Sequence, residues 1–260
     1  PLGVVHAATL GVSEDGVDIG DCVSSPCASL AFALTTAGSG DTITVGAGTF
    51  KGAGNRNLVV NKPITIRGAG LEATVLDLEG AGRGMRFMST STGAVLEDLS
   101  FLNGSCYQVS ADSSEHTGGG LMLEAVAVTV QRVAFRQCKC TRPDGDRIYG
   151  GPYSGGAVHL LNSQSLFEDI LVEDSVAHHG GAVAAWGNDM SIFRRFSFIR
   201  TGGLMWGGST LIESEAVTEF HDGLFSHSFC AVGAVMDDGG TASPLFKNCI
   251  FEYGKSVYGS

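Results

Sequence analysis

The sequence predicts an all-β fold, a right-handed parallel β-helix, in which short strands wind into a solenoid. First, one motif of the form apolar-x-polar-apolar-x-apolar-x-x recurs six times, at intervals of 26 to 37 residues, and units this short must stack on one another to fold. Second, β-branched or aromatic residues fill most of the apolar positions, as in strands. Third, glycine accounts for 38 of 260 residues, which suits sharp corners rather than helical repeats. The copies begin at Leu96, Val130, Phe167, Phe193, Phe220 and Phe246.

Stacking of the six copies predicts two columns of side chains inside the solenoid. Rings in such columns make offset contacts from one coil to the next. The right-handed sense is expected because connections between parallel strands are nearly always right-handed. The first column is formed by motif position 1, the residues at which the copies begin. The second is formed by motif position 6: Phe101, Phe135, Val172, Phe198, Phe225 and Phe251.

Motif position 3 carries charges that alternate in sign through the first five copies. Opposite charges on neighbouring strands stabilise the register by roughly 0.2–1 kcal/mol per pair. Nothing in the apolar pattern requires this alternation, so it supports the alignment independently. The column reads Asp98, Arg132, Asp169, Arg195, Asp222 and Asn248.

Residues 1–50 are predicted to form an N-terminal segment with a capping helix and a first strand, and residues 51–260 the coils. A short helix capped by Ser29 or Ser25 is expected to run through Ala37. Such a helix hides the apolar cross-section and the unpaired edge of the first coil. The acidic residues upstream are interpreted as a solvated loop rather than a calcium site: Glu14, Asp15, Asp18 and Asp21.

The coil region begins with strands expected at 58–60, 64–66 and 74–78. Residues 104–127 and 138–156 are longer, polar, glycine-rich excursions that flank one edge of the stack, where a rigid scaffold usually carries function. The chain closes on a motif and the start of another corner, so we expect further coils or another chain to cover this end. Corners are expected at the Gly-Gly pairs 119–120, 155–156, 180–181 and 202–203.

Two stretches resemble known β-helix proteins. The run from Cys22 through Phe50, followed by LVVNKPITIRGAG at 58–70, resembles the start of pectin-lyase-like right-handed β-helix proteins. The Gly-Gly-Ala-Val blocks at 155–158 and 180–183 resemble the GGA[I/V] repeats of polymorphic outer-membrane-protein passengers, whose FxxN motif is present only loosely. The resemblance spans roughly residues 22–258 and implies the fold more specifically than the function.

The cysteine positions predict disulfides and an extracellular or cell-surface location. Cys106 and Cys140 both occupy motif position 11 of consecutive coils, about 5 Å apart and within disulfide range. Cys22 and Cys27 are interpreted as a local bridge. Asn103 begins an Asn-Gly-Ser glycosylation sequon at the end of a strand. Three cysteines are left unpaired by the sequence: Cys138, Cys230 and Cys249.

The pectin-lyase resemblance implies enzymes that act on acidic polysaccharides. Lyases of this kind use an Arg or Lys base and calcium held by carboxylates, and hydrolases use aspartates placed close together. Calcium is expected only under the lyase hypothesis, and no other cofactor is predicted. The alternating ladder explains most of the candidates without any substrate. The catalytic candidates are Asp98, Asp169, Asp222, Arg132, Arg194 and Arg195.

Aromatic residues near the glycine corners are candidates for stacking on sugar rings. If buried, they would instead seal the end of a coil. His178-His179 and Asp237-Asp238, each before a Gly-Gly pair, are interpreted as solvated turns. The stacking candidates are Trp186, Trp206, Tyr149 and Tyr153.

Composition narrows the functional classes. A net charge of −11 argues against a nucleic-acid partner, and no apolar run approaches the ~20 residues of a membrane span. The first hypothesis is a non-enzymatic, extracellular, structural or adhesive segment of a larger cell-surface or filament-forming assembly, with other chains or coils on its C-terminal end. The alternatives are a polysaccharide lyase or glycosidase acting on uronate-rich glycans, and a carbohydrate-binding module.

Overall fold

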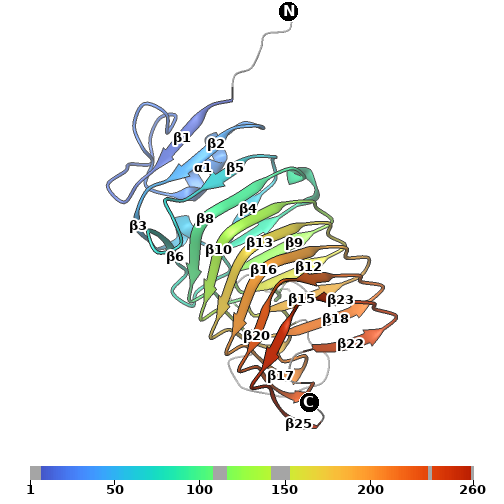
Figure 1. The fold of residues 1–260 in the computed structure, drawn as a ribbon. Coiled ribbons are helices and arrows are strands. Elements are labelled where there is room, and N and C mark those ends of the chain that lie inside the picture. The colour runs from blue at the N-terminus through green and yellow to red at the C-terminus, as the bar shows by residue number, and fades with distance from the viewer. Residues whose placement is uncertain (1–6, 108–115, 142–152, 234–235, 259–260) are drawn as a thin grey trace, which may run out of the picture.

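The computed structural model describes residues 7–107, 116–141, 153–233 and 236–258. Within these residues the chain winds through three sheets, and neighbouring strands in each sheet are parallel (Figure 1). A coil of the chain passes through each sheet in turn, as from β13 (Leu166–Glu173) to β14 (Val176–His179), β15 (Val183–Trp186) and β16 (Ile192–Ile199). The predicted all-β fold with parallel strands is confirmed.

The three sheets are named by size. Sheet 1 has thirteen strands: β1 (Thr9–Val12), β2 (Thr42–Val45), β3 (Gly48–Phe50), β5 (Thr65–Arg67), β6 (Thr74–Asp77), β8 (Val95–Leu102), β10 (Thr129–Arg136), β13, β16, β19 (Glu219–His221), β20 (Leu224–Ser226), β23 (Leu245–Lys247) and β24 (Ile250–Glu252). Sheet 2 has seven: β4 (Leu58–Val60), β7 (Met85–Phe87), β9 (Leu121–Glu124), β12 (Val158–Leu161), β15, β18 (Thr210–Ser214) and β22 (Met236–Gly240). Sheet 3 has five: β11 (Lys139–Cys140), β14, β17 (Gly202–Trp206), β21 (Phe229–Val232) and β25 (Lys255–Tyr258). The helices are α1 (Leu30–Thr36) and the 3₁₀ turns η1 (Ala53–Asn55) and η2 (Ser89–Ser91).

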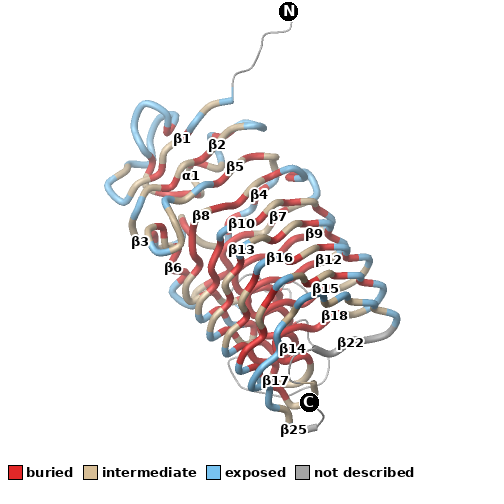
Figure 2. Tube along the Cα trace, viewed as in Figure 1, coloured by how far each residue is buried: buried red, intermediate tan, exposed pale blue. Residues whose placement is uncertain are grey.

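The aromatic columns lie inside the stack, in the predicted register. Phe193 lies opposite Phe167 on one side and Phe220 on the other, with ring centroids 4.3 Å and 5.1 Å away. In the second column, Phe101 and Phe135 stack at 5.3 Å. Buried residues run along the interior of all three sheets (Figure 2). One apolar cluster therefore runs from the first strand to the last coils and crosses residue 50 without a break.

Motif position 3 is a bend as well as a charge column. All six of its residues adopt a left-handed backbone, with φ between 51° and 60°. Motif position 8 forms a second such column, which the sequence did not reveal, with φ between 51° and 56°. Most non-glycine residues avoid this region, and Asn and Asp tolerate it best. The second column comprises Asn103, Gln137, Asp174, Arg200, His227 and Tyr253.

The glycine corners differ from the prediction in detail. One glycine in each of five coils forms the corner, and these glycines stack in a column with a left-handed backbone, φ between 58° and 68°. At Gly155 an added Cβ would lie 2.2 Å from the Val158 carbonyl oxygen, so a larger residue would not fit. Gly202 and Gly203 instead begin strand β17, where the Phe229 ring of the next coil packs directly against Gly202. The prediction of a corner at 202–203 is wrong, because both glycines lie in a strand and the left-handed corner of that coil is at Gly207. The column comprises Gly118, Gly155, Gly180, Gly207 and Gly233.

The N-terminal segment contains both expected and unexpected elements. Helix α1 runs from Leu30 to Thr36, and its N-cap is Ser29, whose hydroxyl accepts a hydrogen bond from the Phe32 amide. The unexpected element is β1, which pairs with β2 as the outermost strand of sheet 1. Its residues, TLGV, alternate in burial, but the acidic run after them concealed the pattern. None of the helices in the described residues is long and apolar enough to cross a membrane.

Two predicted turns are strands. His178 and His179 end β14 and are 4% and 7% exposed, so the prediction of a solvated turn there is wrong. Asp237 and Asp238 lie in β22, which pairs with β18. Polar side chains at both places suggested loops, but the parallel ladder with the preceding coil determines the backbone.

Candidate functional site

Two consecutive coils carry insertions at the same point of sheet 3. In β14 a single residue, His178, separates Ala177 from His179. In the preceding coil, the residues opposite Ala177 and His179 are Cys140 and Ser154. The whole segment between Cys140 and Ser154 therefore replaces one strand residue, and we call it insertion 2.

Insertion 1 leaves the coil before that. Ser105 lies opposite Lys139, and Thr117 lies opposite Ser154. Insertion 1, which we define as residues 107–116, therefore begins and ends beside insertion 2. The predicted excursions leave the same edge of the stack, side by side, but they are shorter than predicted, because 121–124 form β9 and 139–140 form β11.

A disulfide between Cys106 and Cys140 joins the starts of the two insertions. A second disulfide joins Cys22 to Cys27 in the N-terminal segment. Both are the pairs expected from sequence, and such bonds are typical of oxidising compartments. Burial raises the pKa of the Cys138 thiol to about 12, which makes it an inert interior group. The cysteines outside the two disulfides are Cys138, Cys230 and Cys249.

A groove of about 280 Å³ lies where the insertions start. Asn103 and Gln137 border it from the position-8 column, and Lys139 borders it from β11. Tyr107 and Thr141, the first residues of the two insertions after the disulfide, complete the border. Tyr107, Gln137 and Lys139 are exposed, so the groove presents amide, hydroxyl and ammonium groups to solvent. We call it the insertion groove.

Sequence reasoning singled out only Asn103 among these residues. Gln137 is aligned with Asn103 at motif position 8, and that shared position is the signal that identifies both. Lys139 and Tyr107 carry no local signal, because their proximity depends on the disulfide and the stacking of two coils.

The Asn103 side chain is partly engaged. Its amide nitrogen donates a 3.0 Å hydrogen bond to Asp77. Burial by itself would raise the pKa of Asp77, but hydrogen bonds from Asn103 and the Glu79 amide, together with Lys51, hold that pKa below its usual value. Asn103 lines the insertion groove, so a glycan on its side chain would begin at that groove.

A cluster of histidine and aromatic rings lies at the ends of the insertions. Tyr153 is 6% exposed, and its ring centroid lies 5.4 Å from those of both His116 and His178. Trp206 stacks on His179 at 5.0 Å. Burial of Tyr153 rules it out as an exposed sugar platform, and Tyr149 lies outside the described residues.

The two tryptophans do not form one platform. Trp186 ends β15 in sheet 2, whereas Trp206 ends β17 in sheet 3. Both are partly buried, and Trp186 lies against His159 with ring centroids 6.3 Å apart. They pack against histidines at coil ends, which fits the alternative role of sealing the end of a coil.

Two of these histidines have strongly shifted pKa values. Burial, reinforced by the Arg83 guanidinium, lowers the pKa of His159 to about 3. Burial, with the neighbouring His178, lowers the pKa of His179 to about 4. Both rings are therefore neutral around pH 7.

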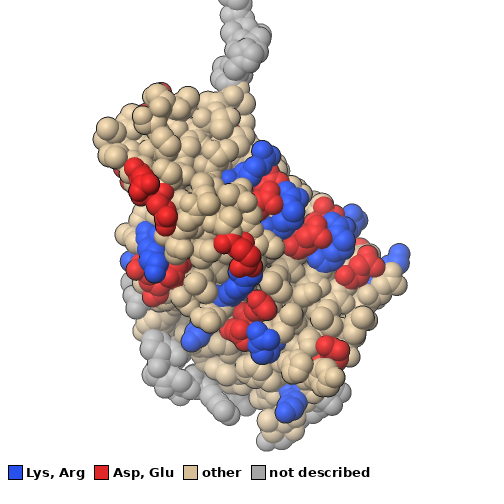
Figure 3. Space-filling view, turned by 60° about the vertical axis from the view of Figure 1, so that its left-hand side comes forward, with Lys and Arg blue, Asp and Glu red and all other residues tan. Residues whose placement is uncertain are grey.

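The candidate catalytic residues form a ladder on the outer face of sheet 1, where acidic and basic side chains adjoin in rows (Figure 3). Arg132 donates two hydrogen bonds to Asp98, at 2.6 and 3.0 Å. Arg195 does the same to Asp169, at 2.8 and 3.0 Å, and these bonds hold the pKa of Asp169 below its usual value. A general acid needs the opposite shift.

The remaining ladder members are paired in the same way. Asp222 accepts a 3.0 Å hydrogen bond from the Asn248 amide. Arg194 lies 3.9 Å from Glu168. An arginine separates Asp98 from Asp169 in the column, so the ladder brings no two of the candidate aspartates together in the way that glycoside hydrolysis requires.

Acidic and histidine side chains in the described ranges do not converge on a metal site. Those ranges contain no cluster of three or more His, Cys, Asp or Glu side chains arranged to hold a metal ion. In the acidic N-terminal loop, Asp18 accepts hydrogen bonds from the amides of Ala28 and Ser29 and from the Ser29 hydroxyl. That carboxylate therefore anchors the start of α1.

No family model and no curated protein matches this sequence. Among solved structures, the chain is similar to the catalytic domain of a GH87 alpha-1,3-glucanase in complex with nigerose, with 13% identity, a TM-score of 0.40, and coverage of 98% of this chain and 66% of the glucanase domain. It is also similar to a rhamnogalacturonan lyase, with 11% identity, a TM-score of 0.29, and coverage of 94% and 87%. The chain thus spans just under two thirds of the glucanase domain. These values are too low to assign it to either family.

Proposed function

We propose that this chain is an extracellular right-handed parallel β-helix that binds a polysaccharide in the insertion groove. One observation carries the proposal. Two insertions leave consecutive coils at the same point, are joined by the Cys106–Cys140 disulfide, and start beside a groove lined by hydrogen-bonding side chains.

The chemistry of the groove supports a saccharide. Sugar hydroxyls both donate and accept hydrogen bonds, and the amides of Asn103 and Gln137 offer both kinds of partner. The exposed Tyr107 ring offers an apolar surface for a sugar face. The groove volume, about 280 Å³, lies near the lower end of the range for small-ligand sites.

Charge indicates which saccharides to favour. Lys139 is the one charged side chain among the described residues that line the groove. An ammonium group beside the sugar favours a carboxylate on it, and therefore a uronate-containing chain over a neutral glucan. This is the substrate class of the lyase alternative, although the residues proposed here are not those of the ladder.

Calorimetric titration with oligogalacturonate, a rhamnogalacturonan oligosaccharide and a neutral α-1,3-glucan oligosaccharide tests the proposal. We expect the Lys139→Gln variant to lose about tenfold affinity for the uronate and little for the glucan, because one charge-assisted contact is removed. Lys247→Gln, at an exposed lysine of β23, is the matched control. Equal losses in the two variants, or no binding of any probe, would refute saccharide recognition at this groove.

Analysis of the oligosaccharides recovered after these titrations distinguishes binding from cleavage. Unsaturated uronate ends in the product would indicate a lyase, and new reducing ends without unsaturation would indicate a hydrolase. Binding without either product supports a carbohydrate-binding role. Calcium added to the uronate reaction tests whether cleavage depends on that ion.

A second candidate function is end-on assembly. The last described coil leaves Ile250 and Phe251 61% and 50% exposed, although Phe251 continues the buried aromatic column. Another coil stacked on this end would bury both. Sedimentation velocity of Phe251→Asp, with Met190→Asp as a control at equal exposure, tests this idea. Association in the parent and the Met190 variant that is lost in the Phe251 variant supports assembly; a parent that stays monomeric at high concentration contradicts it.

A further inference from the structure

The insertion groove continues as two rows of outward side chains along the corner between sheets 1 and 3. One row is motif position 8, which supplies Asn103 and Gln137 to the groove. The other is motif position 10, which supplies Ser105 and Lys139 and keeps one parallel register through the later coils. Because side chains alternate along a strand and position 9 between the rows is buried in the middle coils, both rows face outward. Beyond the groove, position 10 reads Val176, Gly202, Phe229 and Lys255.

Aromatic rings occupy these rows three coils beyond the groove. Phe229 is 42% exposed and Tyr253 is 68% exposed. The exposed His227 ring stacks on Tyr253, with ring centroids 4.7 Å apart and 27° between the planes. Three coil-to-coil steps separate Lys139 from Phe229, about 14 Å at the ordinary spacing of strands. We call the three rings, together with Lys255, the ring subsite.

The rings are held in place by neighbouring residues. A Cβ at Gly202 would lie 2.0, 2.2 and 2.4 Å from three atoms at the tip of the Phe229 ring, which places the glycine under the face of that ring. The opposite face is thereby left for a ligand. The Ser226 hydroxyl lies 2.7 Å from His227 Nδ1 and donates a 2.9 Å hydrogen bond to Glu252, which orients the histidine. Rings that are already ordered lose little side-chain entropy when a ligand binds.

Positive charge accompanies the rings. Lys255 is exposed and lies next to Phe229 in the position-10 row. Asp174 is the one acidic residue at the positions of the two rows, and Arg200 of the next coil donates two hydrogen bonds to it, at 2.6 and 2.9 Å. That pair is neutral, so the charge of the path comes from Lys139 at one end and Lys255 at the other.

We propose that a uronate-containing polysaccharide bound in the insertion groove runs along the solenoid axis and stacks on the ring subsite. This extension rests on the proposed function and adds to it the direction of the ligand, its minimum length and a second point of contact. Sugar faces pack on the rings, and carboxylates of the same chain meet the ammonium groups of Lys139 and Lys255. A periodic polymer can engage both places at once, which raises its affinity over that of a short oligomer.

Calorimetric titration of the intact chain with digalacturonate and octagalacturonate tests the extension. The parent should bind the octamer at least about tenfold more tightly than the dimer, because only the octamer reaches the rings. Phe229→Ala should weaken octamer binding about fivefold and leave dimer binding unchanged. Phe229→Tyr keeps the ring and should bind like the parent. Lys139→Gln should weaken the binding of both lengths.

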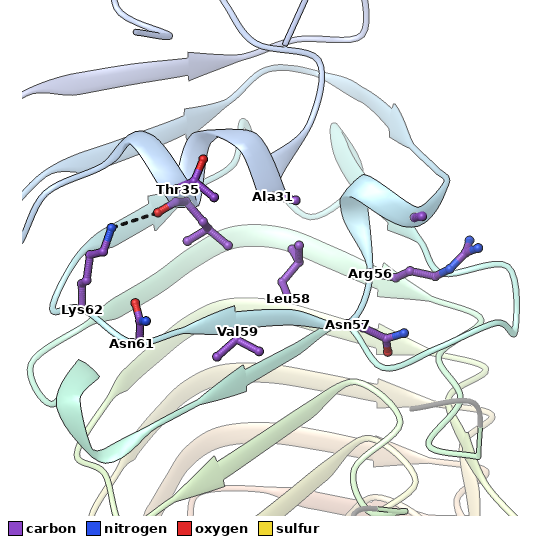
Figure 4. Close-up of a pocket in the computed structure, with 10 residues that line it drawn as sticks. Ala31, Thr35, Arg56, Asn57, Leu58, Val59, Asn61 and Lys62 are labelled. Carbon is purple, nitrogen blue, oxygen red and sulfur yellow. Dashed lines mark hydrogen bonds between the residues drawn. The ribbon is translucent and has the colours of Figure 1, made fainter. Parts of the chain in front are cut away.

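The cleft of about 480 Å³ between α1 and β4, near the N-terminal end of the stack, supplies the matched control (Figure 4). Helix α1 lies there beside β4, where another strand would continue sheet 2, and Lys62 fastens it to the carbonyls of Leu34 and Ala37. Val59 is 53% exposed in this cleft, a fraction similar to that of Phe229. Val59→Ala removes exposed apolar surface away from both rows and should bind both oligosaccharides like the parent.

The outcomes separate the extension from the groove. Equal affinity of the parent for both lengths, parent-like octamer binding by Phe229→Ala, or an equal loss in Val59→Ala overturns the extension and leaves saccharide binding in the groove intact. Octamer binding that survives Lys139→Gln overturns the proposed function, and the continuous path with it. Self-association that is lost in Phe229→Ala at unchanged octamer affinity would instead assign the rings to contacts between copies of the chain. Thermal melting of each variant confirms that it is folded.

Discussion

The outer face of sheet 1 and the insertion-bearing edge of sheet 3 are built on the same coils but use charge differently. On sheet 1, Arg132 and Arg195 each bind the aspartate of the preceding coil through two hydrogen bonds. At the edge of sheet 3, Lys139 borders a groove and is left exposed. The first arrangement satisfies charges within the protein, whereas the second leaves a charge available to a ligand.

Regularity accompanies the internal pairing. Strands β10, β13 and β16 on sheet 1 are all eight residues long and keep one register, whereas sheet 3 shows register irregularities between β14 and β17 and between β17 and β21. The repeat therefore fixes strand length and register on sheet 1, whereas differences in coil length are concentrated at the edge of sheet 3 where the insertions leave.

The largest effect is expected inside sheet 1. Phe193→Ala removes a fully buried ring between two stacked neighbours and should destabilise the fold by about 3–5 kcal/mol, measured by urea unfolding. Phe251→Ala, at the half-exposed end of the other aromatic column, should cost about 1 kcal/mol. Similar losses in the two variants would show that the columns do not act as a continuous core.

The two disulfides should differ in their effect on stability and binding. Replacing Cys106 and Cys140 with serine opens a 34-residue loop and should cost about 4 kcal/mol in the chain-entropy model, with loss of saccharide binding. Replacing Cys22 and Cys27 opens a loop with a separation of 5 and should cost about 2 kcal/mol, with binding retained. Saccharide binding that survives the loss of the Cys106–Cys140 bond would show that this disulfide is not needed to hold the insertion groove.

Lowering the pH should destabilise the fold through the buried His159 and His179 before it affects the ladder of sheet 1. The folded pKa values of His159 and His179, about 3 and about 4, lie below the unfolded value of 6.5. Their contribution to stability is therefore fully present above pH 6.5 and is lost as the pH falls toward the folded values. Each should cost about 2 kcal/mol between pH 6.5 and about pH 5.

The slope of unfolding free energy against pH checks this expectation. The slope is proportional to the number of protons taken up on unfolding, and His159→Gln should remove about one of these protons in the same interval. Asn248→Ala, which removes a neutral group from the ladder, should leave the slope unchanged. A parent whose stability is flat from pH 7 to about pH 5 would show that the histidines accept protons without unfolding.

The smallest effect is expected on the outer face of sheet 1. Arg195→Gln should lower the melting temperature only slightly, because the pair with Asp169 is exposed and screened by solvent. Arg195→Asn should be close to neutral, since asparagine tolerates the left-handed backbone there and can bind Asp169 as Asn248 binds Asp222. Thermal melting at low and high salt measures both, and a loss as large as that of Phe251→Ala would assign the ladder a larger role in stability.

The sequence by itself determined the repeat and the features that depend directly on it. Six motif copies predicted the strands of sheet 1 from β8 onward, the two aromatic columns, the order of charges at position 3 and the Cys106–Cys140 pair, because each depends only on equivalent positions in consecutive coils. Local chemistry also located α1 and left its cap between Ser25 and Ser29, of which the structure uses Ser29.

The tertiary structure alone decided everything that depends on neighbours outside the motif. The burial of His178 and His179 and the place of Lys139 beside Tyr107 arise from stacking between coils that differ in length. The unpaired edge of β4 likewise exists only because a helix lies where a strand would continue the sheet. A periodic pattern specifies which residues stack, whereas the groups that remain free to bind are known only once all coils are in place.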